Sequence, residues 1–365
     1  MIYLDNGATT LIKPKSVKDA MLCALETCGN PGRGGYKASL TAAKTVLGCR
    51  LLAGELFDCP PEQVVMTTSC THGLNIAIRT LAKPGARVVI SGFEHNAVTR
   101  PLYALQAKVT VAGRNLFDWE DMLWNFELAL KQGQDAAVFT HVSNVFGYVL
   151  PVEEMAALCR HYGVPFVVDA AQSAGSLPVS LEKWAADFIA MPGHKGLLGP
   201  QGTGLLLCTA TPKPLLYGGT GSNSASAEMP DFLPDLLEPG TLNVPGIAGL
   251  AAGLSWLKNK GVEKLHSRQN EQLMRCVRAL KKLGLKVFSG ANQCSTVSFV
   301  PAGDVEELAQ QLGERGIAVR AGLHCAPLAH ESTGTLQTGT VRISLGHHTT
   351  PAHISTLIET LRSIL

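Results

Sequence analysis

The region between residues 64 and 208 alternates short runs of β-branched and apolar residues with stretches of helical periodicity. Strands that are apolar on both faces and separated by helices are typical of a mostly parallel sheet covered on both sides. We identify five such strands, at residues 64–67, 87–90, 108–111, 137–140 and 166–169. Ligands of these α/β folds bind at the carboxyl ends of the strands, so we expect the functional site at that edge.

The pattern changes after about Leu207. Residues 216–245 are rich in Gly, Ser and Pro, which predicts a long loop. The remainder predicts a smaller α/β domain with a helix at 262–283, strands at 296–300, 317–320 and 340–345, and helices at 305–314 and from Pro351. For 365 residues we expect a large domain over 15–250 and a small C-terminal domain over 251–365, with residues 1–14 packing near the small one.

Net charge, the N-terminal residues and the cysteine spacing argue against several functional classes. The formal net charge is only +2, which gives no support to a nucleic-acid or membrane partner. The first residues lack the basic start and apolar run of a signal peptide, so we expect a cytoplasmic enzyme. None of the ten cysteines forms a C-x-x-C pair, which argues against structural zinc. His347, His348 and His353 precede or begin the last helix, and we interpret them as a solvated turn rather than a metal site.

The strongest chemical signal is the pair Asp169 and Lys195. Asp169 ends an apolar strand, so its carboxylate is expected at the carboxyl edge of the sheet, where it could hold a pyridine nitrogen protonated. Lys195 follows Gly193-His194 in a nearly uncharged segment, where a lysine loses its proton readily and can act as a Schiff-base nucleophile. Taken singly, the aspartate could be a helix cap and the lysine a surface residue. Their combination favours a pyridoxal-phosphate (PLP) site.

A second signal lies at residues 67–75, where hydroxyl residues follow a strand and precede a helix expected from about Gly73. The N–H groups of a helix N-terminus bind phosphate, although the same pattern also describes an ordinary helix cap.

These motifs, together with Tyr3-Leu4-Asp5-Asn6-Gly7-Ala8-Thr9-Thr10 at the start, resemble the class V aminotransferase group of fold-type I PLP enzymes. Within it the sequence is similar to the cysteine desulfurases and selenocysteine lyases. The resemblance extends nearly end to end, as far as the segment around Arg342. It implies a large PLP-binding domain and a smaller C-terminal α/β domain.

The resemblance also implies a role for individual residues. Lys195 would hold PLP as a Schiff base, and Asp169 would pair with the pyridinium nitrogen. The other cofactor contacts it implies are Gln172 and Asn144 at the ring hydroxyl, His95 stacked on the ring, Cys70 and Thr71 at the phosphate, His194 beside the lysine, and Thr241 from a neighbouring subunit, hence a homodimer. Pro192 stands where relatives often have a phosphate-binding serine, so one phosphate contact is missing or replaced.

The C-terminal region suggests which reaction is catalysed. The segment 317–327 resembles the desulfurase loop that bears the nucleophilic cysteine, here Cys325. Arg342 matches the arginine that binds the substrate carboxylate, with Ala8 and Asn144 as further substrate contacts. The short interval between Cys325 and Arg342 resembles the group II desulfurases.

The implied reaction takes sulfur from L-cysteine to give L-alanine and a Cys325 persulfide, which a sulfur-acceptor protein could discharge. His95 could shuttle protons in this reaction. The alternatives are a selenocysteine lyase, another class V reaction such as transamination or β-elimination with Cys325 a bystander, and a non-catalytic binding role. The intact set of Lys195, Asp169 and Arg342 argues against the last of these.

Overall fold

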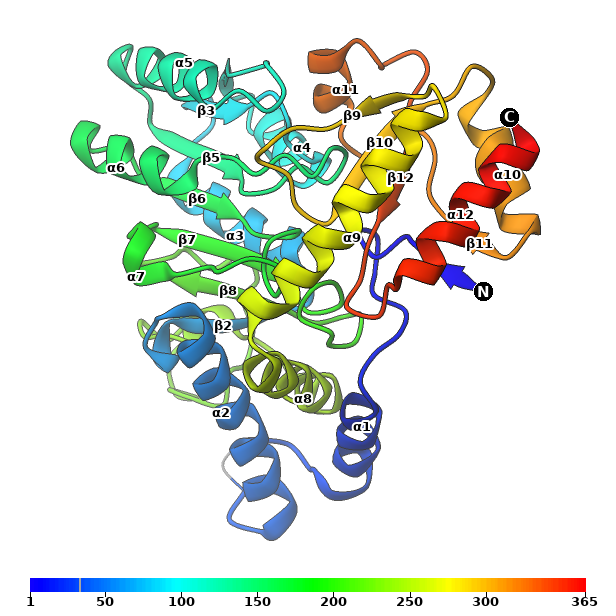
Figure 1. The fold of residues 1–365 in the computed structure, drawn as a ribbon. Coiled ribbons are helices and arrows are strands. Elements are labelled where there is room, and N and C mark those ends of the chain that lie inside the picture. Colours follow the sequence, from blue (N-terminus) through cyan, green and yellow to red (C-terminus); the bar gives the residue numbers. More distant parts are fainter. Residues whose placement is uncertain (33) are drawn as a thin grey trace.

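The computed structural model describes residues 1–32 and 34–365 and contains three sheets (Figure 1). The strands are β1 (Ile2–Tyr3), β2 (Val64–Thr67), β3 (Arg87–Ser91), β4 (Lys108–Ala112), β5 (Ala136–Thr140), β6 (Phe166–Asp169), β7 (Phe188–Pro192), β8 (Gly204–Cys208), β9 (Lys286–Phe288), β10 (Thr296–Val300), β11 (Ile317–Ala318) and β12 (Val341–Ser344). The α-helices are α1 (Lys15–Thr27), α2 (Lys37–Phe57), α3 (Cys70–Leu81), α4 (Asn96–Ala104), α5 (Trp119–Lys131), α6 (Val152–Tyr162), α7 (Leu181–Trp184), α8 (Val244–Lys260), α9 (Val262–Lys282), α10 (Val305–Glu314), α11 (Pro327–Thr333) and α12 (Pro351–Ile364). Two short 3-10 helices cover Pro61–Gln63 and Asp235–Leu237.

The largest sheet has seven strands in the order β2-β8-β7-β6-β5-β3-β4. Strands β4, β3, β5, β6 and β7 run parallel, whereas β8 is antiparallel to both β7 and β2. The predicted mostly parallel α/β sheet is therefore confirmed.

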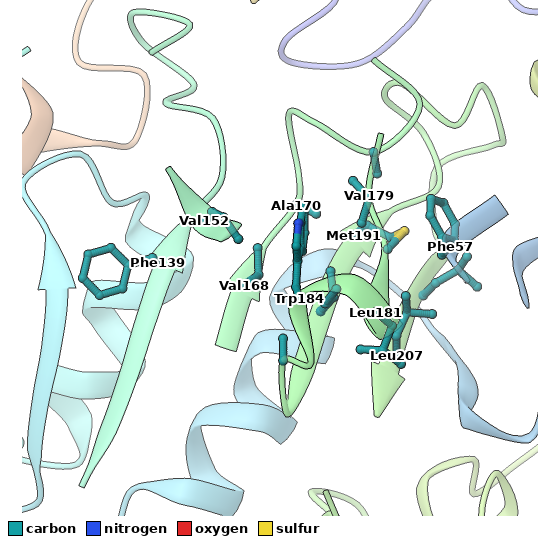
Figure 2. Packing of buried hydrophobic residues seen from close by; sticks show 14 of the residues in the cluster. Phe57, Phe139, Val152, Val168, Ala170, Val179, Leu181, Trp184, Met191 and Leu207 are labelled. Carbon is teal, nitrogen blue, oxygen red and sulfur yellow. The ribbon is translucent and has the colours of Figure 1, made fainter. Parts of the chain in front are cut away.

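Successive residues of the central strands point to opposite faces of this sheet, because side chains alternate along a strand. Val167 of β6 joins one apolar cluster, which α3 and α4 complete. Its neighbours Phe166 and Val168 join a larger cluster on the other face, with α2, α5, α6 and α8. Figure 2 shows part of this larger core, where Val168 and Ala170 flank the position of Asp169 and fix the strand end that carries it.

The C-terminal region forms its own layer, in which α9, α10 and α12 share an apolar cluster with β10 and β12. The N-terminal strand β1 pairs with β11, so the first residues of the chain lie beside this layer (Figure 1). Within residues 1–32 and 34–365, no helix is long and apolar enough to cross a membrane.

The predicted loop at 216–245 is confirmed as far as residue 243, apart from the short 3-10 helix, whereas α8 (Val244–Lys260) was not predicted. The helix expected from about Gly73 begins at Cys70, where Ser69 is the N-cap and accepts a hydrogen bond from the His72 amide. The predicted strand at 296–300 and the predicted helix at 305–314 are confirmed at the same residues.

Candidate active site

A cavity of about 240 Å³ opens at the carboxyl ends of the central strands. Its lining gathers residues from widely separated parts of the chain, among them Ala8, Cys70, Thr71, His95, Asn144, Asp169, Gln172, Pro192, His194, Lys195, Arg320, His324, Cys325 and Arg342. Every site residue named from the sequence except Thr241 lies here. This volume is somewhat below the usual range for small-molecule sites, and the lining is unusually rich in ionisable groups.

Asp169 is the last residue of β6 and is almost fully buried. Its Oδ1 accepts hydrogen bonds from the Ala171 amide at 2.9 Å and from the Cys70 thiol at 3.4 Å. No described residue donates a hydrogen bond to Oδ2. The carboxylate therefore has one fixed oxygen and one that is available to a ligand.

Lys195 lies in a tight glycine-containing turn between β7 and β8. The turn is closed by the Gly199 amide, which donates to the Gly193 carbonyl at 2.7 Å, and by the Thr10 hydroxyl, which donates to the Lys195 carbonyl at 2.9 Å. Burial lowers the pKa of the Lys195 amine, and the nearby Asp169 carboxylate opposes that shift. Lys195 thus combines a backbone held by hydrogen bonds with a readily lost proton.

His95 caps the N-terminus of α4, and its Nδ1 accepts a hydrogen bond from the Ala97 amide at 3.0 Å. Because Nδ1 acts as an acceptor, the proton of the neutral ring is assigned to Nε2. Burial lowers the pKa of His95, which favours this neutral form. His95 accordingly presents an N–H donor rather than a base.

Asn144 follows β5 and is buried beside the cavity. Its Nδ2 donates to the His324 carbonyl at 2.7 Å, and its Oδ1 has no hydrogen-bond partner among the described residues. Gln172 is held from the other side, where its Nε2 donates to the Gly7 carbonyl at 3.0 Å. Both amides are thus oriented by backbone groups.

The first turn of α3 borders the cavity through Cys70 and Thr71. The amides of Cys70 and Thr71 have no acceptor among the described residues, which makes this end suited to an anion. His194 lies nearby, with Nδ1 3.0 Å from the Thr9 hydroxyl, and burial lowers its pKa to about 4. Pro192 ends β7 in the lining and offers no hydroxyl.

Arg342 on β12 is one of the largest fully buried side chains in the described chain. Its Nη1 donates to the Asn144 carbonyl at 2.9 Å and its Nη2 to Asp5 Oδ1 at 2.7 Å, while Nε has no partner among the described residues. Arg320 lines the same cavity and forms an isolated backbone bridge with Arg342. The cavity therefore carries two guanidinium groups and suits an anionic ligand.

Cys325 is exposed, whereas the neighbouring His324 is buried. Both residues have positive φ angles, of 58° and 51° respectively, and two hydrogen bonds hold this turn. The Asn96 amide donates to the Cys325 carbonyl at 2.8 Å, and Asn144 holds the His324 carbonyl. Burial lowers the pKa of His324 to about 2, so this ring is neutral beside the cysteine.

Thr241 lies outside this site. It is exposed and lines a separate surface cavity of about 600 Å³ together with Arg50, Leu47 and Glu238. A single chain does not bring Thr241 to Lys195.

The sequence reasoning missed three residues near the site: Asp5, Arg320 and Glu94. Asp5 and Arg320 belong to segments that were singled out for other residues, Gly7-Ala8 and Cys325. Glu94 precedes His95 and is fully buried, and its carboxylate accepts hydrogen bonds from the Ser91 hydroxyl and from the Thr140 amide at 2.9 Å. The available signal was a carboxylate soon after the end of the buried strand β3.

Comparison with known proteins gives a consistent result. The sequence matches the aminotransferase class-V family over residues 2–357. A probable cysteine desulfurase of Methanothermobacter thermautotrophicus is 31% identical, with the alignment covering 100% of this chain and 94% of the relative. One from Pyrococcus abyssi is 30% identical, with 100% and 94% covered.

The similar solved structures are also cysteine desulfurases. The apo cysteine desulfurase of Thermococcus onnurineus superposes with a TM-score of 0.92 at 29% identity, covering 100% of this chain and 94% of that one. The cysteine desulfurase CsdA of Escherichia coli gives a TM-score of 0.86 at 26% identity, with 99% and 94% covered.

Proposed function

The chain belongs to the aminotransferase class-V family, and we propose that it is a PLP-dependent cysteine desulfurase that converts L-cysteine to L-alanine and retains the sulfur as a persulfide on Cys325. The observation that carries the proposal is that an exposed cysteine, Cys325, lines one cavity with Lys195 and the buried Arg342. The relatives and solved structures that carry the desulfurase name support it over the full length of the chain.

The residues of the cavity fit PLP. The free Oδ2 of Asp169 suits a protonated pyridine nitrogen, and the unpartnered Oδ1 of Asn144 suits the ring hydroxyl. Lys195 would bind the cofactor covalently, and the first turn of α3 with Cys70 and Thr71 would hold its phosphate. When bound, PLP supplies a sink for electrons released at the substrate carbon. Three further contacts follow from the family resemblance, those of Gln172, His194 and the partner subunit's Thr241.

Arg342 would bind the substrate carboxylate through the guanidinium donors that Asp5 and the Asn144 carbonyl leave free. Its planar group forms paired hydrogen bonds with a carboxylate, which fixes the orientation of the amino acid. Ala8 lines the same cavity as Arg342 and would pack against the substrate.

Lys195 would act as a base, and His95 would act as a hydrogen-bond donor. Lys195, with a pKa lowered by burial, would remove the Cα proton as a neutral amine. His95 would keep its proton at Nε2 and donate a hydrogen bond from it within the cavity, because its Nδ1 accepts a hydrogen bond from the Ala97 amide.

Cys325 would attack the substrate sulfur as a thiolate, the reactive form of cysteine. The S–S bond forms as the Cβ–S bond breaks. In total, one Cys325 thiol and one L-cysteine give one persulfide and one L-alanine. An external thiol or a sulfur-acceptor protein must then discharge the persulfide before the next turnover.

A homodimer is part of the proposal. Leu40, Leu47 and Leu51 lie on one face of α2 and are each about half exposed, and Leu47 shares a surface cavity with Thr241. An apolar helix face of this kind is suited to a subunit interface, and covering it would bring a second chain beside Thr241.

The decisive experiment incubates the purified, PLP-loaded protein with L-cysteine and a thiol reductant. Equal amounts of alanine and sulfide are expected, whereas a keto acid product would contradict desulfuration and favour transamination. Yellow absorbance of the lysine-bound cofactor is expected in the wild type and not in Lys195→Ala. Its persistence in that variant would refute the assignment of Lys195.

A further inference from the structure

Cys70 places a second thiol in the candidate active site, and its environment differs from that of Cys325. Cys325 is exposed, whereas Cys70 is 8% exposed and begins α3. Cys70 belongs to the apolar cluster that also includes Ala190 and Leu206. Its Sγ lies 3.4 Å from Asp169 Oδ1.

The direction of this hydrogen bond follows from the chemistry of the two groups. A carboxylate only accepts hydrogen bonds, so the proton must come from the thiol. Burial and the adjacent Asp169 carboxylate both raise the pKa of Cys70 well above its ordinary value, so the thiol keeps its proton. Cys70 is therefore a donor in this site and not a nucleophile.

The hydrogen bond from Cys70 helps to fix the orientation of the Asp169 carboxylate. The Ala171 amide and the Cys70 thiol both donate to Oδ1, from different segments of the chain. With two donors on one oxygen, rotation of the carboxylate would cost a hydrogen bond, and Oδ2 stays directed away from both donors. We propose that Cys70 is a positioning residue whose S–H group fixes Asp169 so that Oδ2 meets the pyridine nitrogen of PLP.

This inference rests on the proposed PLP function and adds a role for the side chain of Cys70, beyond the backbone N–H groups of the same turn. A thiol is a weaker donor than a hydroxyl, so it can orient the carboxylate while withdrawing little of its charge. Serine at this position should preserve the orientation, whereas alanine should release it.

The hydrogen bond itself can be tested on the apoprotein by infrared spectroscopy. The S–H band of Cys70 is isolated as the difference between the wild type and Cys70→Ala. Asp169→Asn should shift that band towards the frequency of a weakly bonded thiol, because a neutral amide oxygen is a poorer acceptor than a carboxylate. A Cys70 band that does not move in Asp169→Asn would overturn the inference.

The positioning role is tested by the Kd for PLP, measured by fluorescence titration of the apoprotein. Cys70→Ala should weaken binding about threefold to tenfold, the range expected for one modest hydrogen bond to a charged group. Cys70→Ser should bind within about twofold of the wild type. Cys159→Ala, which truncates a buried cysteine of α6 away from the cavity, serves as the matched control and should leave the Kd unchanged.

The unfolding temperature of each apoprotein separates positioning from simple packing. A lower unfolding temperature in Cys70→Ala with an unchanged Kd would mean that the thiol only fills space, and would contradict the proposal. A wild-type protein that does not bind PLP would refute the proposed function, and with it the positioning role, while the infrared result would still decide the hydrogen bond.

Discussion

Asp5 and Arg342 form a buried ion pair that joins the N-terminal segment to β12, with Nη2 2.7 Å from Oδ1. The arginine side chain is 2% exposed and the aspartate side chain 19% exposed. Burial lowers the pKa of Arg342, and Asp5 is the largest influence that raises it. The proposed carboxylate-binding arginine therefore depends on a counter-ion supplied by the first few residues of the chain.

Asp5→Ala should lower the free energy of unfolding of the apoprotein by about 2–3 kcal/mol, because it leaves a buried cation without its partner. Urea denaturation measures the effect. Asp19→Ala is the control, since it removes the exposed Lys15–Asp19 pair and should change stability by less than about 0.5 kcal/mol. Equal losses in the two variants would contradict a structural role for the Asp5–Arg342 pair.

Cys325→Ala should reduce kcat for L-cysteine at least about 100-fold, because the substrate sulfur loses its acceptor. The cysteine is exposed, so the unfolding temperature and the cofactor absorbance should match the wild type. The control is Cys23→Ala, which truncates an exposed cysteine on α1. Unimpaired cysteine turnover in Cys325→Ala would make Cys325 a bystander, and turnover of selenocysteine alone would leave its role in desulfuration intact.

The sequence predicted the central strands well because runs such as 166–168 are apolar at every position, and both faces of the sheet are covered. The sequence did not predict α8, because this helix contains several glycines and glycine disfavours a helix. Two of them are required by close packing: a Cβ on Gly249 would lie 2.7 Å from the Met21 side chain, and one on Gly253 would lie 2.4 Å from the Leu197 carbonyl. These glycines allow α8 to pack closely against other parts of the chain, and such contacts cannot be read from the residues of the helix alone.

In the candidate site, the residues named from motifs converge because strand ends and their following turns meet at one edge of the sheet. The partners that orient them were not predictable. Asp5 meets Arg342 across 337 positions of sequence, and Cys70 meets Asp169 across 99. Such pairs depend on how the layers pack, so the sequence indicated the chemistry more readily than the hydrogen bonds that position it.

Gly175→Ala should destabilise the protein by about 2 kcal/mol or more and weaken PLP binding. Gly175 has a φ of 80°, and a Cβ there would lie 2.3 Å from the Gly196 carbonyl oxygen, in the turn that carries Lys195. The clash is with backbone, so the lysine turn itself must move. Gly163→Ala is the matched control, since Gly163 also has a positive φ of 64° but faces open space, and should cost about 1 kcal/mol with no effect on PLP binding. Similar effects in both variants would show that the turn adapts.

Glu94 should make the stability of the protein depend on pH. Full burial raises its pKa to about 8, despite hydrogen bonds from Ser91 and Thr140 that favour the charged form. Between its ordinary value of 4.5 and about 8, the folded protein holds a proton at Glu94 that the unfolded chain has lost. Stability from this group is therefore complete below pH 4.5 and is lost progressively as the pH rises towards 8.

Glu94→Gln removes this titration while keeping the size of the side chain. Relative to Glu94→Gln, the wild-type apoprotein should lose about 3–4 kcal/mol of unfolding free energy between pH 5 and pH 8, measured by urea denaturation at both values. Other titrating groups affect both proteins equally and cancel in the difference. Parallel pH profiles would mean that Glu94 is ionised in the folded state across this range, with Thr140 and Ser91 compensating for its burial.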